Sequence, residues 1–161
     1  MQTRLLIAGL LLALLSSCGF SLRGSDVLSS RYNALALDSP QPNLELPRLL
    51  RQRLIAADVA VLEPDQTDAP LLRLGNETET SRPVSINTRA SAAQHEIRLS
   101  VTVSLSRGDE ELLAPQTLIV ERSYAENIEL ISGNQDEKQI ILSEMRYDLV
   151  EQILRTLEAT E

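Results

Sequence analysis

EIRLSVTVSLS, residues 96–106, is the stretch that decides the fold, because its side chains alternate without interruption between apolar and polar. Successive side chains of a strand point to opposite faces, so this pattern predicts a strand with one buried face and one face in water. The buried face would consist of Ile97, Leu99, Val101, Val103 and Leu105. Half-buried strands of this kind are typical of antiparallel sheets that are covered on one side.

Segments on both sides of this stretch extend the predicted sheet. A turn is expected at Gly108 and Asp109, and residues 116–125 (QTLIVERSYA) return as the next strand. Upstream, residues 32–39 (YNALALDS) alternate in the same way and predict a first strand. Residues 71–80 (LLRLGNETET) alternate at first and then become fully polar, so they predict a strand that ends early.

Two segments change to the helical period of about 3.6 residues. In residues 44–57, Pro47 is compatible only with the first turn, so that helix is expected to begin at residues 44–47. Residues 134–158 begin with a pattern like a capping box, in which Glu137 follows Asn134. The apolar face of this second helix is Leu142, Met145, Leu149, Ile153 and Leu157.

The order of these elements is strand, helix, three strands and helix, which predicts an α/β (α+β) fold. Two helices on one face of a mixed sheet of about four strands would form a two-layer sandwich. No internal repeat or change of composition marks a second domain. We therefore expect a single domain over residues 32–161, preceded by a tether over residues 18–31.

The first 17 residues have the three-part organisation of an export signal. Arg4 supplies the basic end, residues 5–15 are apolar, and two serines follow. The apolar stretch reaches roughly half way across a hydrocarbon core about 30 Å thick, so it is too short to remain as a transmembrane helix. We expect residues 1–17 to be a signal peptide that is removed.

The only cysteine of the chain, Cys18, ends the sequence LSSC, which resembles the lipobox of bacterial lipoproteins. This resemblance implies a diacylglyceryl thioether on Cys18 and acylation of the new amino terminus. Two or more acyl chains hold a protein stably on a membrane. Because Gly19, and not aspartate, follows the cysteine, the predicted location is the outer membrane, with the domain on its periplasmic side.

The composition excludes one class of partner. The chain has a formal net charge of −8, whereas nucleic-acid binding needs clustered lysine and arginine. It contains one phenylalanine, three tyrosines and no tryptophan, so it lacks most of the means of stacking bases or sugars. We expect no nucleic-acid partner, and a core built mainly from leucine, isoleucine and valine.

The sequence offers no set of residues for catalysis or metal binding. His95, the only histidine, precedes the strong strand and has no G-x-S-x-G nucleophile to serve, so we expect it to be a solvated residue at a strand end. The pairs Glu77/Glu79 and Glu110/Glu111 stand at a strand end and a turn, where we expect solvated charges. One histidine, an acylated cysteine and scattered acids do not have metal-ligand spacing. We expect no enzymatic activity, no cofactor and no metal.

Residues 80–94 (TSRPVSINTRASAAQ) depart from the acidic background, because they carry Arg82 and Arg89 and no acid. Guanidinium groups bind phosphate in a bidentate way, and Val84 and Ile86 could lie against acyl chains. The stretch is therefore either a site for an anionic, amphipathic ligand or a hairpin loop with two solvated arginines.

Two motifs, CGFSLRG (residues 18–24) and NQDEKQIILSEMRYDLVEQILRTL (residues 134–157), stand at the two ends of the chain expected after cleavage. Together, and with the order of elements between them, they resemble the LptE family of lipopolysaccharide-assembly lipoproteins. The resemblance implies an α/β sandwich seated in the lumen of a large outer-membrane β-barrel, LptD. It also implies a role in barrel assembly and in delivery of lipopolysaccharide to the cell surface.

The resemblance further implies contact with lipopolysaccharide through basic loop residues, and Arg89 best fills that position. Arg82 is its neighbour in the same loop, and Lys138, the only lysine, stands near the start of the final helix. This chain departs from a strongly basic lipid-binding surface, since Asp136 and Glu137 directly precede Lys138.

Three other functions stay open. An auxiliary lipoprotein of an inner-membrane lipid transporter would share the anchor and the mixed fold, and membrane fractionation would separate it from the first interpretation. A lipid-anchored hydrolase would lose activity in a His95→Ala variant. A periplasmic lipid chaperone would bind its ligand without a stable protein partner.

Overall fold

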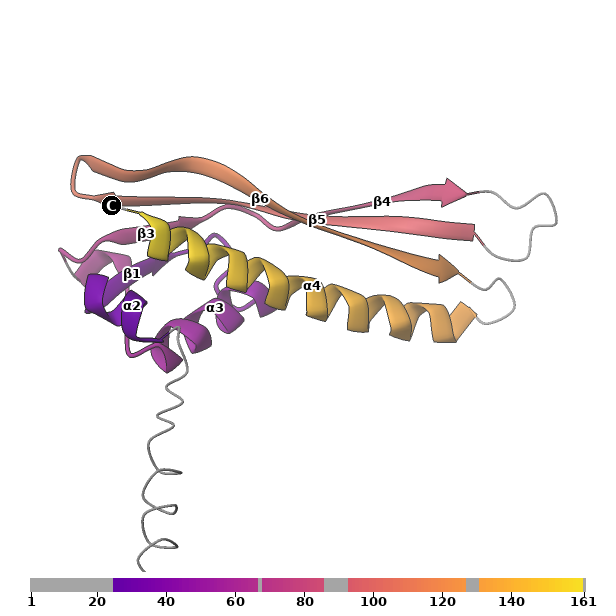
Figure 1. The fold of residues 1–161 in the computed structure, drawn as a ribbon, viewed down its shortest axis with the longest axis horizontal. Helices are drawn as coiled ribbons and strands as arrows, with labels where there is room; N and C mark the ends of the chain where they lie inside the picture. Colours follow the sequence, from indigo (N-terminus) through magenta and orange to yellow (C-terminus); the bar gives the residue numbers. More distant parts are fainter. Residues whose placement is uncertain (1–24, 67, 86–92, 127–130, 161) are drawn as a thin grey trace, which may run out of the picture.

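The sheet of this protein lies over a layer of helices, and both layers are elongated in the same direction (Figure 1). The computed structural model describes residues 25–66, 68–85, 93–126 and 131–160. In chain order the elements are α2 (Ser25–Arg31), β1 (Ala34–Asp38), α3 (Glu45–Ala56), β2 (Ala60–Leu62), the 3-10 turn η1 (Pro64–Gln66), β3 (Leu71–Leu74), β4 (Thr78–Ser85), β5 (Ala93–Arg107), β6 (Glu110–Glu126) and α4 (Ile131–Ala159).

Strand β5 organises a six-stranded mixed sheet. β6 pairs with it in antiparallel orientation along one edge. On the opposite edge, β3 pairs with the C-terminal part of β5 and β4 pairs with its N-terminal part, both antiparallel. Between β3 and β4, the Gly75 amide donates to the Thr102 carbonyl of β5 at 2.8 Å. β1 then pairs in parallel with β3, and β2 pairs in parallel with β1.

The hydrophobic core lies between this sheet and helices α2, α3 and α4, which cover one face (Figure 1). The five apolar residues predicted from the alternating stretch of β5 are all buried in it. They contact the apolar face predicted for the last helix, Leu142, Met145, Leu149, Ile153 and Leu157, which is buried as well. The predicted fold class, α/β layers with a mixed sheet covered on one side, is confirmed.

The turn between β5 and β6 is also where the sequence places it. β5 ends at Arg107 and β6 begins at Glu110, so Gly108 and Asp109 form the connection. Gly108 has a φ of +57°, a value that a residue without Cβ adopts readily and that primed hairpin turns require.

The sheet has more strands than the four or so that the sequence predicts. The main addition is β4, whose sequence TETSRPVS has no apolar alternation, and which we had expected to belong in part to a loop over residues 80–94. It forms because β5 extends beyond the core and offers a free edge, with which Thr78–Pro83 pair in unbroken register. Polar strands of this kind leave no hydrophobic pattern from which to predict them.

Both ends of the described chain are more helical than expected. Within the expected tether, Ser25–Arg31 form helix α2, and Leu28 is buried in the core. The Arg31 guanidinium donates to the Thr160 carbonyl just after α4, and the Tyr32 hydroxyl donates to the Leu157 carbonyl at 3.4 Å. α4 begins at Ile131, before the predicted cap at Asn134, and is 29 residues long.

Candidate functional site

The structure describes two of the four predicted functional residues. Cys18 and Arg89 lie outside the described residues. Arg82 lies in β4, not in a loop, and its side chain is 71% exposed. Lys138 lies on α4, within the part predicted to be helical.

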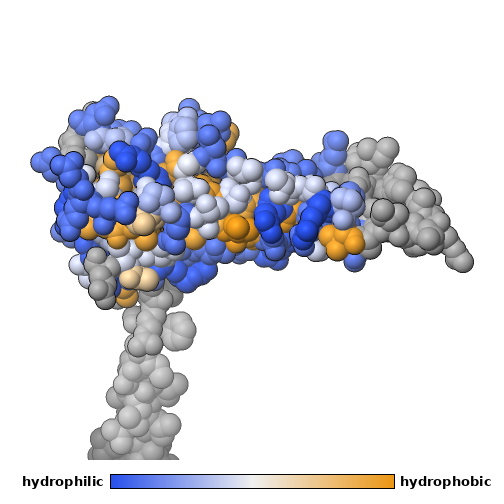
Figure 2. Space-filling view, turned by 90° about the horizontal axis from the view of Figure 1, so that it is seen from above, coloured by the Kyte–Doolittle hydropathy of each residue, from blue (hydrophilic) through white to orange (hydrophobic). Residues whose placement is uncertain are grey.

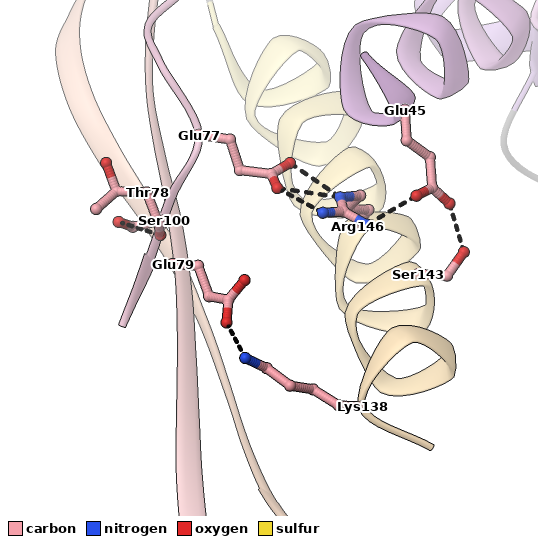
Figure 3. Close-up of polar contacts among 8 residues, drawn as sticks. All are labelled: Glu45, Glu77, Thr78, Glu79, Ser100, Lys138, Ser143 and Arg146. Atoms are coloured by element: carbon pink, nitrogen blue, oxygen red, sulfur yellow. Dashed lines mark hydrogen bonds and ion pairs between the residues drawn. The ribbon is translucent and has the colours of Figure 1, made fainter. Parts of the chain in front are cut away.

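Arg82 and Lys138 are on opposite faces of the sheet. Arg82 pairs in register with Glu96 of β5 on the face away from the helices, and its Nε lies 2.7 Å from the Glu96 Oε1. Lys138 reaches up from α4 to Glu79 of β4, with 2.7 Å between Nζ and Oε1 (Figure 3). Glu79 lies opposite the buried Leu99, which marks the helix-covered face. The structure therefore does not bring these two cations into one binding site.

Each of these cations has a carboxylate partner, but neither partner holds it strongly. Ion pairs with exposed or half-exposed side chains are worth about 0–1 kcal/mol, because water competes for both charges. The Arg82–Glu96 and Lys138–Glu79 pairs are of this kind. A phosphate group could replace the carboxylate at little cost, so the pairing leaves a role in anion binding open.

The strongest polar cluster in the described chain is centred on Arg146 of α4 (Figure 3). Its Nη2 lies 2.8 Å and its Nε 3.1 Å from Glu77 Oε1, and Nε also lies 3.1 Å from Oε2. Its Nη1 lies 2.7 Å from Oε2 of Glu45, the first residue of α3. Glu45 also accepts a hydrogen bond from Ser143. One guanidinium thus ties the start of α3 and the start of β4 to α4.

Because this cluster is largely buried, we expect it to contribute more to stability than the exposed ion pairs do. The side chains of Arg146 and Glu77 are only 16% and 15% exposed. The hydrogen bonds to Glu77 raise the pKa of Arg146 above its usual range, against the opposing effect of burial. Glu45 gains a further favourable interaction, because a carboxylate at the first turn of a helix faces the positive end of the helix dipole.

The sequence analysis missed this cluster, since it assigned Glu77 to a solvated strand end. A signal was present in the last helix. Arg146 follows Leu142 by four residues and precedes Leu149 by three, which places it on the flank of the apolar stripe. A charge at such a position needs a partner on the element that the stripe covers. The sequence could not name that partner.

His95 is not the solvated strand-end residue that we expected. It lies within β5, and its ring stacks on Tyr124 of β6 with 5.6 Å between ring centroids. In the parts of the chain that the structure describes, no group of three or more His, Cys, Asp or Glu residues is arranged to hold a metal ion. Within the same parts, no helix is long and apolar enough to cross a membrane.

The face of the sheet away from the helices is lined by hydroxyl groups. Thr102 of β5 and Thr117 of β6 contact each other there at 3.1 Å between hydroxyl oxygens. Register places further serines and threonines on the same face, namely Thr78, Thr80, Ser100, Ser104, Ser106 and Ser123. Three ion pairs lie among them, namely Arg82–Glu96, Arg98–Glu121 and Arg73–Asp38. We call this surface the hydroxyl face.

The hydroxyl face carries little exposed hydrophobic surface. Ile119 of β6 is its main apolar side chain and is 43% exposed. In the view from above Figure 1, hydrophobic residues form separate patches among hydrophilic and near-neutral ones (Figure 2). A surface of this kind suits contact with water or with a polar wall rather than with lipid chains.

Comparison with known proteins identifies the family. The model of the lipopolysaccharide-assembly family LptE matches residues 32–157, which is most of the chain. The chain belongs to the LptE family. Curated relatives named LPS-assembly lipoprotein LptE include those of Photorhabdus laumondii, 30% identical over 152 residues, and Pectobacterium atrosepticum, 29% identical over 153 residues. Each alignment covers 94% of this chain and 83% of the relative.

Solved structures of two other lipoproteins share this fold. Lipoprotein B of Nitrosomonas europaea superposes with a TM-score of 0.68 at 20% identity, covering 88% of this chain and 91% of that one. Rare lipoprotein B of Shewanella oneidensis gives a TM-score of 0.65 at 24% identity, covering 78% and 93%. The family match confirms the resemblance to LptE that the sequence motifs indicate, and the chain is a member of a family of lipopolysaccharide-assembly lipoproteins.

Proposed function

We propose that this protein is a non-enzymatic lipoprotein of the outer membrane that partners the LptD β-barrel in lipopolysaccharide assembly. The observation that carries this proposal is the match to the LptE family over residues 32–157. In this proposal residues 1–17 are removed, Cys18 is acylated, and the folded domain is held on the periplasmic side of the membrane.

The hydroxyl face supports a position inside the barrel lumen. The interior of a wide membrane barrel is polar, so a protein that fills it must present polar side chains to the wall. The hydroxyl face offers serine and threonine side chains, which can donate and accept hydrogen bonds without the cost of burying unpaired charge. Within each of its three ion pairs, the two opposite charges neutralise each other.

Contact with lipopolysaccharide is the second part of the proposal. We assign it to Arg89, with Arg82 and Lys138 in support. Arg89 follows Arg82 by seven positions in the same basic stretch of the sequence. Because Arg82 and Lys138 lie on opposite faces of the sheet, each would contact a different part of the lipid headgroup or a different ligand position.

Depletion of the protein in its native host tests the assembly role. We expect the large barrel to lose its folded, heat-modifiable form and surface lipopolysaccharide to fall, with recovery when the wild-type chain is supplied. A control strain supplied with a Cys18→Ser chain should recover poorly, because that chain lacks its anchor. Normal barrel folding and normal surface lipopolysaccharide after full depletion would refute the proposal.

A further inference from the structure

Strand β6 leaves one edge of the sheet without a strand partner among the described elements. The backbone direction along this edge follows from the bond between the Gly75 amide and the Thr102 carbonyl on the opposite side of β5. In an antiparallel pair both backbone groups of a residue point the same way. Thr102 therefore points away from β6, and its register partner Thr117 points away from β5.

The same alternation fixes the neighbours of Thr117. Leu118 and Val120 bond to β5, whereas Ile119, Glu121 and Ser123 direct their amide and carbonyl groups to the free edge. A side-chain contact agrees with this assignment. The Gln152 amide of α4 donates to the Ile119 carbonyl at 3.5 Å, from outside the strand pair.

The free edge is regular where it is open and irregular where it is protected. From Gln116 to Glu126, β6 keeps unbroken register with β5. Before that, register shifts opposite Val103–Ser106 and the residue Pro115 interrupt the strand, as is usual where a protein protects an edge. Apart from the Gln152 contact, the edge-directed backbone groups of Thr117, Ile119, Glu121 and Ser123 have no partner within the described chain.

A groove runs between this edge and the C-terminal part of α4. Its volume is about 510 Å³, and Leu112, Leu113 and Leu118 of β6 form its apolar wall. Gln152, Arg155 and Thr156 of α4 line the other side. The groove begins beside the irregular part of β6 and reaches the free edge at Gln116 and Leu118, close to the contact of Gln152 with the Ile119 carbonyl.

The groove also contains a cation that has no carboxylate partner among the described residues. Arg155 is exposed, and no carboxylate of the described residues forms an ion pair with it, although Arg51 and Arg53 of α3 and Arg146 of α4 have such a pair. An occupant with a carboxylate near Arg155 would form a charge-assisted hydrogen bond there.

These features together define the chemistry of an occupant. Unpaired backbone groups in a row select an extended polypeptide, since lipids and sugars cannot supply a matching ladder. Every second side chain of an added strand would point to the helix side and enter the groove, so an apolar residue is required there. A carboxylate close to it would meet Arg155.

We infer that the β6 edge receives an extended segment of the LptD barrel protein, with an apolar side chain in the groove and a carboxylate at Arg155. The partner in this inference rests on the proposed function. A closed barrel wall has no free strand edge, so the segment belongs to a loop or extension of the barrel chain outside the wall.

The first test removes one edge-directed amide. Full-length tagged chains are purified in mild detergent from the outer membrane of the native host, and co-purified barrel is quantified. Ile119→Pro deletes an amide that does not bond to β5, so we expect the fold to survive and the barrel yield to fall at least about fivefold. Ile119→Thr keeps the amide and should retain several times more barrel than Ile119→Pro.

A second test does not depend on the proline variant folding. Hydrogen exchange of residues 116–125 is compared between the wild-type chain alone and its complex with the barrel. We expect about half of these amides to exchange fast in the free chain and at least tenfold more slowly in the complex. Unchanged fast exchange in the complex would overturn the inference, as would a folded Ile119→Pro chain that retains full barrel yield.

The two proposals fail in different ways. If no barrel protein co-purifies with the wild-type chain, the proposed function fails and this inference fails with it. If the barrel protein co-purifies with the wild-type chain but the amides of the β6 edge still exchange fast in the complex, only this inference fails. A crosslink from a photoreactive residue at position 123 to a second copy of the chain, in place of the barrel, would also overturn it.

Discussion

Arg146 of α4 forms a bidentate ion pair with Glu77, the residue before β4. The distances are 2.8 Å between Nη2 and Oε1 and 3.1 Å between Nε and Oε2. The two residues are 69 positions apart in the chain. The pair fixes the long helix against the strand that carries Arg82, so it positions one end of the proposed lipopolysaccharide-contact region from within the fold.

Arg146→Gln should destabilise the protein by roughly 2–4 kcal/mol, because it leaves the Glu77 carboxylate, which is only 15% exposed, without its cation. The free energy of unfolding in urea measures this effect. The matched control is Arg122→Gln, which breaks the half-exposed pair with Asp148 and should cost less than about 1 kcal/mol. Equal effects of the two changes would show that burial of the Arg146–Glu77 pair has no special weight.

The raised pKa of Tyr32 predicts that the protein loses stability at alkaline pH. Burial raises the pKa of Tyr32 above its ordinary value, and Arg31 and Arg107 only partly oppose this. A group whose pKa is raised by folding stabilises the fold below its unfolded pKa, here about 10, and this contribution is lost as pH rises through the raised value. The unfolding free energy should therefore fall above about pH 10.

Tyr32→Phe should flatten that alkaline decline, as measured by urea unfolding between about pH 8 and pH 11. Tyr147→Phe is the control, since the Tyr147 ring is 45% exposed. The explanation fails if Tyr32→Phe and the wild-type chain lose stability in parallel over this range.

Arg89→Asp should weaken binding of purified lipopolysaccharide by about tenfold, which corresponds to about 1.4 kcal/mol, without unfolding the domain. Arg82→Asp is expected to have a smaller effect on affinity, because Arg82 already forms an ion pair with Glu96. Arg48→Asp makes the same charge change at an exposed position on α3 and serves as the control. Unchanged affinity of Arg89→Asp, together with native circular dichroism, would contradict the assignment.

Cys18→Ser should abolish acylation and release the protein from the membrane fraction, since no other cysteine is available. Labelling with a palmitate analogue and membrane fractionation measure the two effects. Gly19→Asp is a sharper variant, because it keeps the lipid and should move the protein to the inner membrane. Labelled protein after Cys18→Ser would rule out this anchor.

The sequence predicts those parts of the fold whose residues carry periodic apolar patterns. The alternation from Ile97 to Leu105 predicts β5 and its buried face, and Gly108 predicts the turn that follows it. β4 was not predicted, because a polar strand is held by pairing to its neighbour and not by a hydrophobic face of its own. Helix α2 was missed because a helix this short is stabilised by tertiary contacts such as that of Leu28.

The candidate site was predicted less completely than the fold. Composition and position singled out Arg82 and Lys138, but only the register of β4 on β5 shows that they lie on opposite faces. The Arg146–Glu77 pair and the free edge at Ile119 depend on contacts between distant segments, which periodicity within one segment does not encode.

The most direct test of the account is the composition of the complex that the wild-type protein forms in its own membrane. The tagged chain is purified from the outer membrane in mild detergent, and the co-purifying proteins are identified and quantified by mass spectrometry. The account predicts one large β-barrel protein in a one-to-one ratio with this chain. An inner-membrane permease, or no stoichiometric partner at all, would contradict it and favour a transporter accessory or a free-standing lipid chaperone.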